Sequence, residues 1–159
     1  MVSIETYKDS YKADWNNFVD SSKNSTFLFN RDFMDYHSDR FEDFSLMVYE
    51  KSELIALLPL NIIENKVYSH QGLSYGGLIV KNNIKFQKFL ELFIQILKYL
   101  NKKSVDKLFI KQIPSIYNSN FNGELDYLSF MTGCTIYRRD IISVIDMQNS
   151  FKISKDRIQ

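Results

Sequence analysis

The residues best suited to chemistry lie in one stretch of ten, Ser69 to Leu78, with the sequence SHQGLSYGGL. It contains three of the five glycines and one of the two histidines in the 159-residue chain. An imidazole ordinarily titrates near neutral pH, so His70 is suited to proton transfer. The phenol of Tyr75 can donate a hydrogen bond or a proton to a leaving group. We therefore predict that His70 and Tyr75 are catalytic, with a carbonyl-bonded histidine and a packed aromatic ring as the structural alternatives.

The same stretch also offers contacts for a substrate. Glycines allow positive φ angles and a close approach of the backbone to a ligand. Arginines are suited to gripping a phosphate or carboxylate with two parallel hydrogen bonds. The predicted substrate-binding residues are Gln71, Ser74, Gly76, Gly77, Arg40 and Arg138. The alternatives are a plain glycine bulge between two strands and a surface role for the arginines.

Other kinds of site find little support in the sequence. Cys134 is the single cysteine, and no histidine is near it in sequence, which disfavours a thiol nucleophile. One cysteine and two histidines also disfavour a dedicated zinc site. The sequence contains no P-loop, dinucleotide fingerprint or nucleophile elbow. We therefore expect no metal, and no cofactor-binding residue is evident.

Composition limits the partners and the compartment. The formal net charge is +1 and the lysines are dispersed, so nucleic acid and acidic membranes are not expected partners. The apolar segments are shorter than the roughly 20 residues that cross a bilayer, and residues 1–20 lack the apolar core of a signal peptide. A single cysteine favours a reducing compartment. The predicted location is a bacterial cytoplasm.

Hydrophobic periodicity predicts the elements that must position these residues. We expect helices over residues 11–21, 30–41, 84–102 and 124–132. We expect strands over residues 44–49, 54–63, 67–80, 107–113 and 135–147. The first three strands form an antiparallel meander, and the fourth lies parallel to the third because a long helix connects them.

Two details of this pattern make specific predictions. Pro59 interrupts an apolar run and lacks the N–H that a central strand donates, so we expect an edge, a bulge or a splay there. The last strand alternates, with Ile136, Ile141, Val144 and Ile145 facing inward. We expect one domain over residues 1–150. Residues 151–159 start a helix too short to be stable, which suggests that a second half follows.

The order of elements and three local strings resemble the GNAT acyltransferases. The strings are YHSDRF at residues 36–41, the stretch 69–78, and IPSIY at residues 113–117 followed by Glu124, Asp126 and Arg138-Arg139-Asp140. Together they look like the amino-terminal half of bacterial GNAT-related proteins allied to the Fem-type aminoacyl transferases. The resemblance implies an α+β fold with a central mixed, mostly antiparallel sheet flanked by helices. It also implies a second GNAT-like half, or a homodimer partner.

The resemblance implies transfer of an acetyl or aminoacyl group to an amine or hydroxyl of a small molecule or a cell-surface glycan precursor. The donor in the full-length protein would be acetyl-CoA or another acyl donor. GNAT enzymes that use coenzyme A place a glycine-rich loop before the long helix, but residues 79–84 contain no glycine. We therefore expect the chain alone to be inactive. The alternatives are a non-catalytic module that binds a sugar, a peptide or its own second half, and a structural half with a docking face.

Overall fold

The computed structural model describes residues 2–117, 123–141 and 143. Its helices are α1 (Lys12–Ser21), α2 (Arg31–Met34), α3 (Phe86–Lys102) and α4 (Glu124–Met131). Its strands are β1 (Val2–Thr6), β2 (Glu42–Asp43), β3 (Leu46–Glu50), β4 (Glu53–Leu58), β5 (Asn61–Ile63), β6 (Lys66–Tyr68), β7 (Ile79–Val80) and β8 (Lys107–Phe109). Short 3₁₀ turns cover Asp9–Tyr11, Phe27–Phe29, Asp35–His37 and Ser115–Tyr117. The α+β class predicted from the sequence is confirmed.

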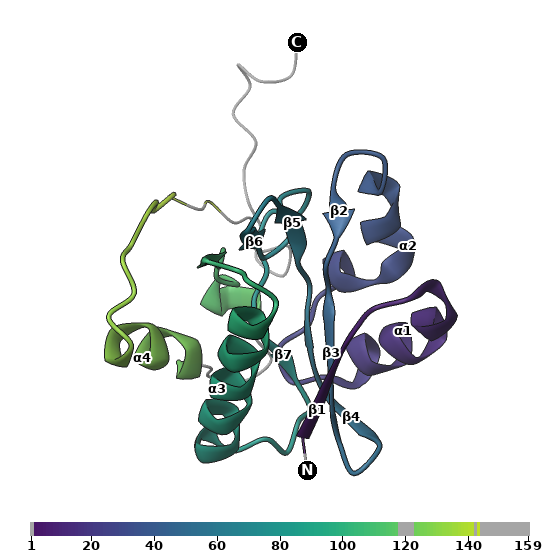
Figure 1. Cartoon of the computed structure of the whole chain (residues 1–159), viewed down its shortest axis with the longest axis horizontal. Coiled ribbons are helices and arrows are strands. Elements are labelled where there is room, and N and C mark those ends of the chain that lie inside the picture. Colours follow the sequence, from purple (N-terminus) through teal and green to yellow (C-terminus); the bar gives the residue numbers. More distant parts are fainter. Residues whose placement is uncertain (1, 118–122, 142, 144–159) are drawn as a thin grey trace, which may run out of the picture.

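The strands form two sheets that part at Pro59. One sheet has the order β1-β3-β4-β7 and the other β2-β5-β6-β8. β4 ends at Leu58 and β5 begins at Asn61, so the predicted splay at Pro59 is confirmed. The predicted parallel pairing is also confirmed, between β6 and β8. As Figure 1 shows, α3 lies beside the sheets on the side away from α1 and α2.

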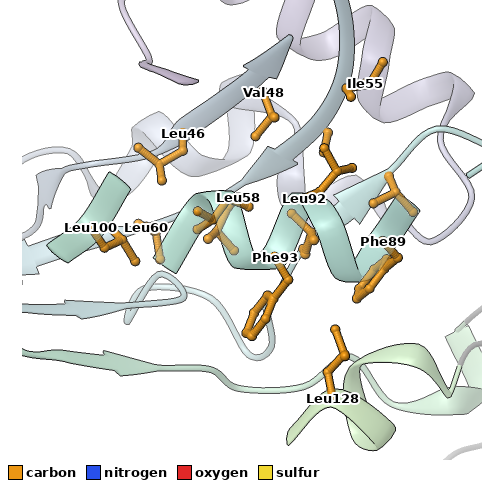
Figure 2. Packing of buried hydrophobic residues seen from close by; sticks show 14 of the residues in the cluster. Leu46, Val48, Ile55, Leu58, Leu60, Phe89, Leu92, Phe93, Leu100 and Leu128 are labelled. Atoms are coloured by element: carbon orange, nitrogen blue, oxygen red, sulfur yellow. The ribbon is translucent and has the colours of Figure 1, made fainter. Parts of the chain in front are cut away.

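The face under α3 is apolar throughout. The spacing of Phe89, Leu92, Phe93, Ile96 and Leu100 places them on one stripe of the helix, and all five are buried. Figure 2 shows these helix residues packed close to strand residues such as Leu46, Val48 and Leu58, with Leu128 of α4 nearby. The helix begins at Phe86, two residues later than predicted, and its N-cap is Lys85.

The opposite face mixes aromatic rings with buried polar groups. Trp15 and Phe29 pack on Leu57 and Ile79. The Arg31 guanidinium carbon lies 3.4 Å from the centroid of the Tyr7 ring and 4.0 Å from that of Trp15. The side chain of Arg31 is only 1% exposed and forms ion pairs with Asp43 and Asp35. Cation–π contacts and ion pairs together hold Tyr7, which follows β1, against α1, α2 and β2.

Several predicted elements were wrong in length or kind. The helix predicted at 30–41 is one turn, α2, followed by a 3₁₀ turn, although Asn30 does cap it by accepting a hydrogen bond from the Asp32 N–H. The strands predicted at 54–63 and 67–80 are each divided in two, and the strand predicted at 107–113 ends at Phe109. The first strand, β1, was not predicted.

The strand predicted at 135–147 is also wrong where it can be checked. Residues 134–141 form no regular element, and Ile136 and Ile141 are 70% and 97% exposed rather than inside. Alternation marks a segment that could be a strand, but a strand also needs a neighbour to pair with, and no described residue pairs with 135–141. Val144, Ile145 and the expected helical start at 151–159 lie outside the described residues.

Candidate functional site

The predicted catalytic stretch is a compact loop between β6 and β7 with a closed neck. A Cβ atom added to Gly76 would lie 2.3 Å from the carbonyl oxygen of Ser69, so only glycine fits there. The Lys111 N–H donates to Ser69 Oγ at 2.7 Å, and the Gly76 N–H donates to the Lys111 carbonyl at 2.7 Å. Both ends of the loop are therefore fixed to the chain just after β8, as in Ω-loops.

His70 occupies a strained and buried position at the start of this loop. Its φ angle is +57°, a left-handed conformation that is costly for a side chain with a Cβ atom. Its carbonyl accepts a hydrogen bond from the Leu73 N–H at 3.0 Å, which closes a turn. The residue is 4% exposed, and its ring meets the Phe41 ring edge-on at 5.9 Å between centroids. The surrounding contacts must hold this conformation, because an isolated histidine disfavours it.

Tyr75 is positioned by two segments, residues 26–29 and the 3₁₀ turn Ser115–Tyr117. Its hydroxyl donates to Thr26 Oγ1 at 3.1 Å. Its ring meets Phe29 edge-on at 6.0 Å and stacks on Tyr117 at 5.2 Å between centroids. Tyr117 is 44% exposed, so the stacked pair reaches the molecular surface there. The phenol oxygen is consequently fixed next to a second hydroxyl group, with which it can share a proton.

The predicted substrate-binding residues divide into two groups. Gln71, Ser74, Gly76 and Gly77 belong to the same loop as His70 and Tyr75, and Ser74 is exposed. Gly77 has a φ angle of +126°, which favours glycine. The two arginines are exposed, with Arg40 beside Asp39 at 3.9 Å and Arg138 bonded to Asp140 at 2.8 Å. Among the described residues, neither arginine forms a hydrogen bond or ion pair with the loop.

Sequence reasoning missed the residues that hold the loop in place. Asn61, on β5, is fully buried, and its amide bonds both the backbone and the side chain of Gln71. Lys111 and Thr26 contact the loop from elsewhere in the chain. Asn61 did carry a signal, because it is the one polar side chain in the apolar run 54–63. No local pattern distinguishes Thr26 or Lys111.

The gap between β7 and α4 is largely filled by the chain itself. Asn24 bonds the outer edge of β7, donating to the Leu78 carbonyl at 2.9 Å and accepting from the Val80 N–H at 3.0 Å. Lys23 forms an ion pair with Glu124 of α4 at 2.5 Å. The remaining cavity is about 30 Å³, lined in part by Asn24, Gly76, Gly77, Gln112 and Asp126. A space of that size holds one or two water molecules.

Three further observations concern other parts of the molecule. An open depression of about 380 Å³ lies between α1 and the β3–β4 turn, and none of the predicted site residues lines it. Among residues 2–117, 123–141 and 143, no three His, Cys, Asp or Glu side chains gather as a metal site. Every helix in the described part of the chain is too short or too polar to cross a membrane.

Comparison with known proteins identifies the fold. No protein-family model and no curated protein matches the chain. An aminoglycoside N-acetyltransferase solved with coenzyme A superposes over 91% of this chain and 95% of its own, with 9% identity and a TM-score of 0.54. An aminoglycoside acetyltransferase from an uncultured soil metagenomic sample covers 92% and 99%, with 11% identity and a TM-score of 0.53.

A third similar structure is a probable acetyltransferase of unknown function from meticillin-resistant Staphylococcus aureus. It covers 92% of this chain and 98% of its own, with 15% identity and a TM-score of 0.50. At these identities the likeness establishes the fold alone. The chain has the fold of the GNAT N-acetyltransferases.

Proposed function

We propose that this chain is the acceptor-binding domain of a GNAT-like acyltransferase related to the Fem-type enzymes. The observation that carries the proposal is the loop 69–78, in which a strained, buried histidine and a fixed tyrosine lie within six residues of each other on this fold. Strained backbone conformations of this kind concentrate at active sites. The acceptor would be an amine or hydroxyl of a small molecule or a cell-surface glycan precursor.

The proposed chemistry assigns one role to each residue of the loop. His70 accepts a proton from the acceptor amine or hydroxyl as it attacks the acyl carbon. Tyr75, hydrogen-bonded to Thr26, donates a proton to the leaving group. Gly76 and Gly77 shape the loop: Gly76 lets the backbone pass against Ser69, and Gly77 adopts a positive φ angle. Gln71 and Ser74 contribute hydrogen bonds, and Arg40 and Arg138 are candidate contacts for an acidic group on the substrate.

We infer that this chain alone does not bind the acyl donor. The protein in complex with coenzyme A among the similar structures suggests an acyl-CoA donor. However, residues 79–84 contain no glycine, the N-cap Lys85 makes no side-chain cap, and the nearby cavity holds about 30 Å³. We therefore propose that the donor, acetyl-CoA or another acyl compound, binds in a second GNAT-like half or at a homodimer interface, in the cytoplasm.

Two observations favour a second function, a non-catalytic binding or docking module. The segment before α3 contains no glycine, and Asn24 occupies the Leu78 carbonyl and the Val80 N–H along β7. Calorimetric titration of residues 1–159 with acetyl-CoA tests whether this chain binds the donor by itself. Saturable heat would support a self-sufficient enzyme and contradict both proposals, and an absence of heat fits either an acceptor domain or a module.

Kinetics of the full-length protein then decide between an acceptor domain and a module. His70→Ala and Tyr75→Phe are the test variants, and Tyr68→Phe is the matched control, since Tyr68 lies on β6 and stacks on Phe109. We expect kcat/KM to fall at least about 100-fold for His70→Ala and about tenfold for Tyr75→Phe. Unchanged kinetics in both variants would remove these residues from the mechanism.

A further inference from the structure

Lys111 contacts the loop 69–78 through both its backbone and its side chain. Its backbone joins both sides of the neck, through Ser69 Oγ and the Gly76 N–H. Its side chain then reaches along the loop, and the ammonium donates to the carbonyl of Leu73 and, at 3.5 Å, to that of Gln71. One residue therefore closes the loop at its base and bonds two carbonyls near its tip.

Asn61 holds the same loop from the opposite strand. Its Oδ1 accepts from the Gln71 N–H at 2.7 Å, and its Nδ2 donates to Gln71 Oε1 at 3.0 Å. Asn61 is fully buried, so an unpaired amide there would be unfavourable and the bonds to Gln71 are strongly preferred. Gln71 follows His70 directly, so both Asn61 and Lys111 act on the backbone next to the left-handed residue.

These contacts account for how His70 keeps its strained conformation. The Leu73 N–H bonds back to the His70 carbonyl, while the Leu73 carbonyl accepts from Lys111. Gln71 is fixed at its N–H by Asn61 and at its carbonyl by Lys111. Gln71 and Leu73, on either side of Gly72 in this turn, thus each have a partner outside the loop. Partial burial disfavours the charged ammonium and so lowers the pKa of Lys111 from its usual value.

We propose that Asn61 and Lys111 are positioning residues for the acceptor loop, which they hold in the shape that presents His70 and Tyr75 to the acceptor. The proposal rests on the function proposed above, and neither residue touches the acceptor itself. Lys111 acts from a chain segment just after β8, about 40 residues from the loop in sequence.

The first test measures the loop without any need for activity. Lys111→Met removes the donors and keeps the aliphatic stem, Lys111→Arg restores a cation, and Lys107→Met, an exposed lysine on β8, is the matched control. We expect amide exchange at Leu73 and Gly76 to quicken about tenfold in Lys111→Met, with partial recovery in Lys111→Arg. Exchange at Phe93 in α3 and the unfolding midpoint should stay near those of Lys107→Met.

The second test uses a double-mutant cycle of Asn61→Ala and Gln71→Ala, which remains informative if Lys111→Met unfolds. Coupling between the two positions, read from exchange at Leu73, supports the proposal, and strictly additive effects would overturn it. In the full-length protein we expect the KM for the acceptor to rise about tenfold in Lys111→Met and kcat to change less than about twofold. Normal exchange and normal KM in Lys111→Met would reject the positioning role while leaving the proposed function intact. Absence of transfer by the wild-type protein would reject the function, and the exchange data would still test the positioning role.

Discussion

The two faces of the sheet β1-β3-β4-β7 are stabilised in different ways. The face under α3 is covered by a single helix whose five buried side chains are all apolar. The face under α1 and α2 contains Trp15 and Phe29 but also the buried polar residues Arg31 and Asn24. Apolar contacts tolerate exchange for side chains of similar volume, whereas buried polar groups need particular partners. The second face is also the one that supports the loop 69–78, through Phe29 and Thr26.

The largest expected effect is on the mixed face. Trp15 is fully buried, its indole N–H donates to the Phe29 carbonyl at 2.8 Å, and its ring stacks on Arg31. Trp15→Ala should lower the free energy of unfolding by about 3–5 kcal/mol. Urea unfolding followed by circular dichroism measures this, since the variant lacks the only tryptophan. A decrease in unfolding free energy below about 1 kcal/mol would contradict the importance of the Trp15 contacts on this face.

A comparable truncation on the α3 face should lower the free energy of unfolding by slightly less. Leu92 is fully buried and Leu97, on the same helix, is 37% exposed. Leu92→Ala should cost about 3 kcal/mol of unfolding free energy, and Leu97→Ala less than about 1 kcal/mol. Equal losses in both variants would show that α3 does not pack on the sheet by this stripe.

A substitution at Gly76 should alter the loop 69–78 without altering the packing on either face of the sheet. Gly76→Ala places a methyl group against the Ser69 carbonyl, so the neck must open at a cost of about 1–3 kcal/mol. We expect faster amide exchange at Gln71 and Leu73 and unchanged exchange at Phe93. Gly123→Ala is the matched control, since a Cβ at Gly123 meets nothing within 4 Å.

The smallest effect is electrostatic and lies at the surface. The hydrogen bond from Lys88 lowers the pKa of Glu50 below its usual range. A lowered folded-state pKa stabilises the protein above the unfolded pKa of about 4.3, and this contribution is lost as the pH falls through the folded value. Lys88→Met should therefore lower Tm slightly at pH 7, with the difference from wild type disappearing in strong acid. A difference that grows on acidification would contradict the assignment.

The parts of the fold that follow from repeating patterns were predictable. The apolar stripe from Phe89 to Leu100 predicted α3, Pro59 predicted the parting of the sheets, and the length of α3 predicted the parallel pair β6 and β8. The strand expected at 135–147 was wrong over residues 135–141, because alternation specifies a face and says nothing about a pairing partner.

The candidate site was predictable only in part. The residues of the loop were identified from their types, since glycines, a histidine and a tyrosine in one stretch are unusual. The contacts that fix them join distant positions, such as Tyr75 with Thr26 and Leu73 with Lys111, and no local pattern links such pairs. The sandwich of Arg31 between Tyr7 and Trp15 was missed for the same reason.

The most direct test compares one variant from the loop with one from the α3 face in the two-part protein proposed above. Acyl transfer to an amine acceptor is measured for His70→Ala and Leu92→Ala at a temperature where circular dichroism shows both to be folded. The account predicts at least about a 100-fold loss of kcat/KM for His70→Ala with little change in Tm, and a lowered Tm with near-normal transfer for Leu92→Ala. Near-normal transfer by His70→Ala would contradict it.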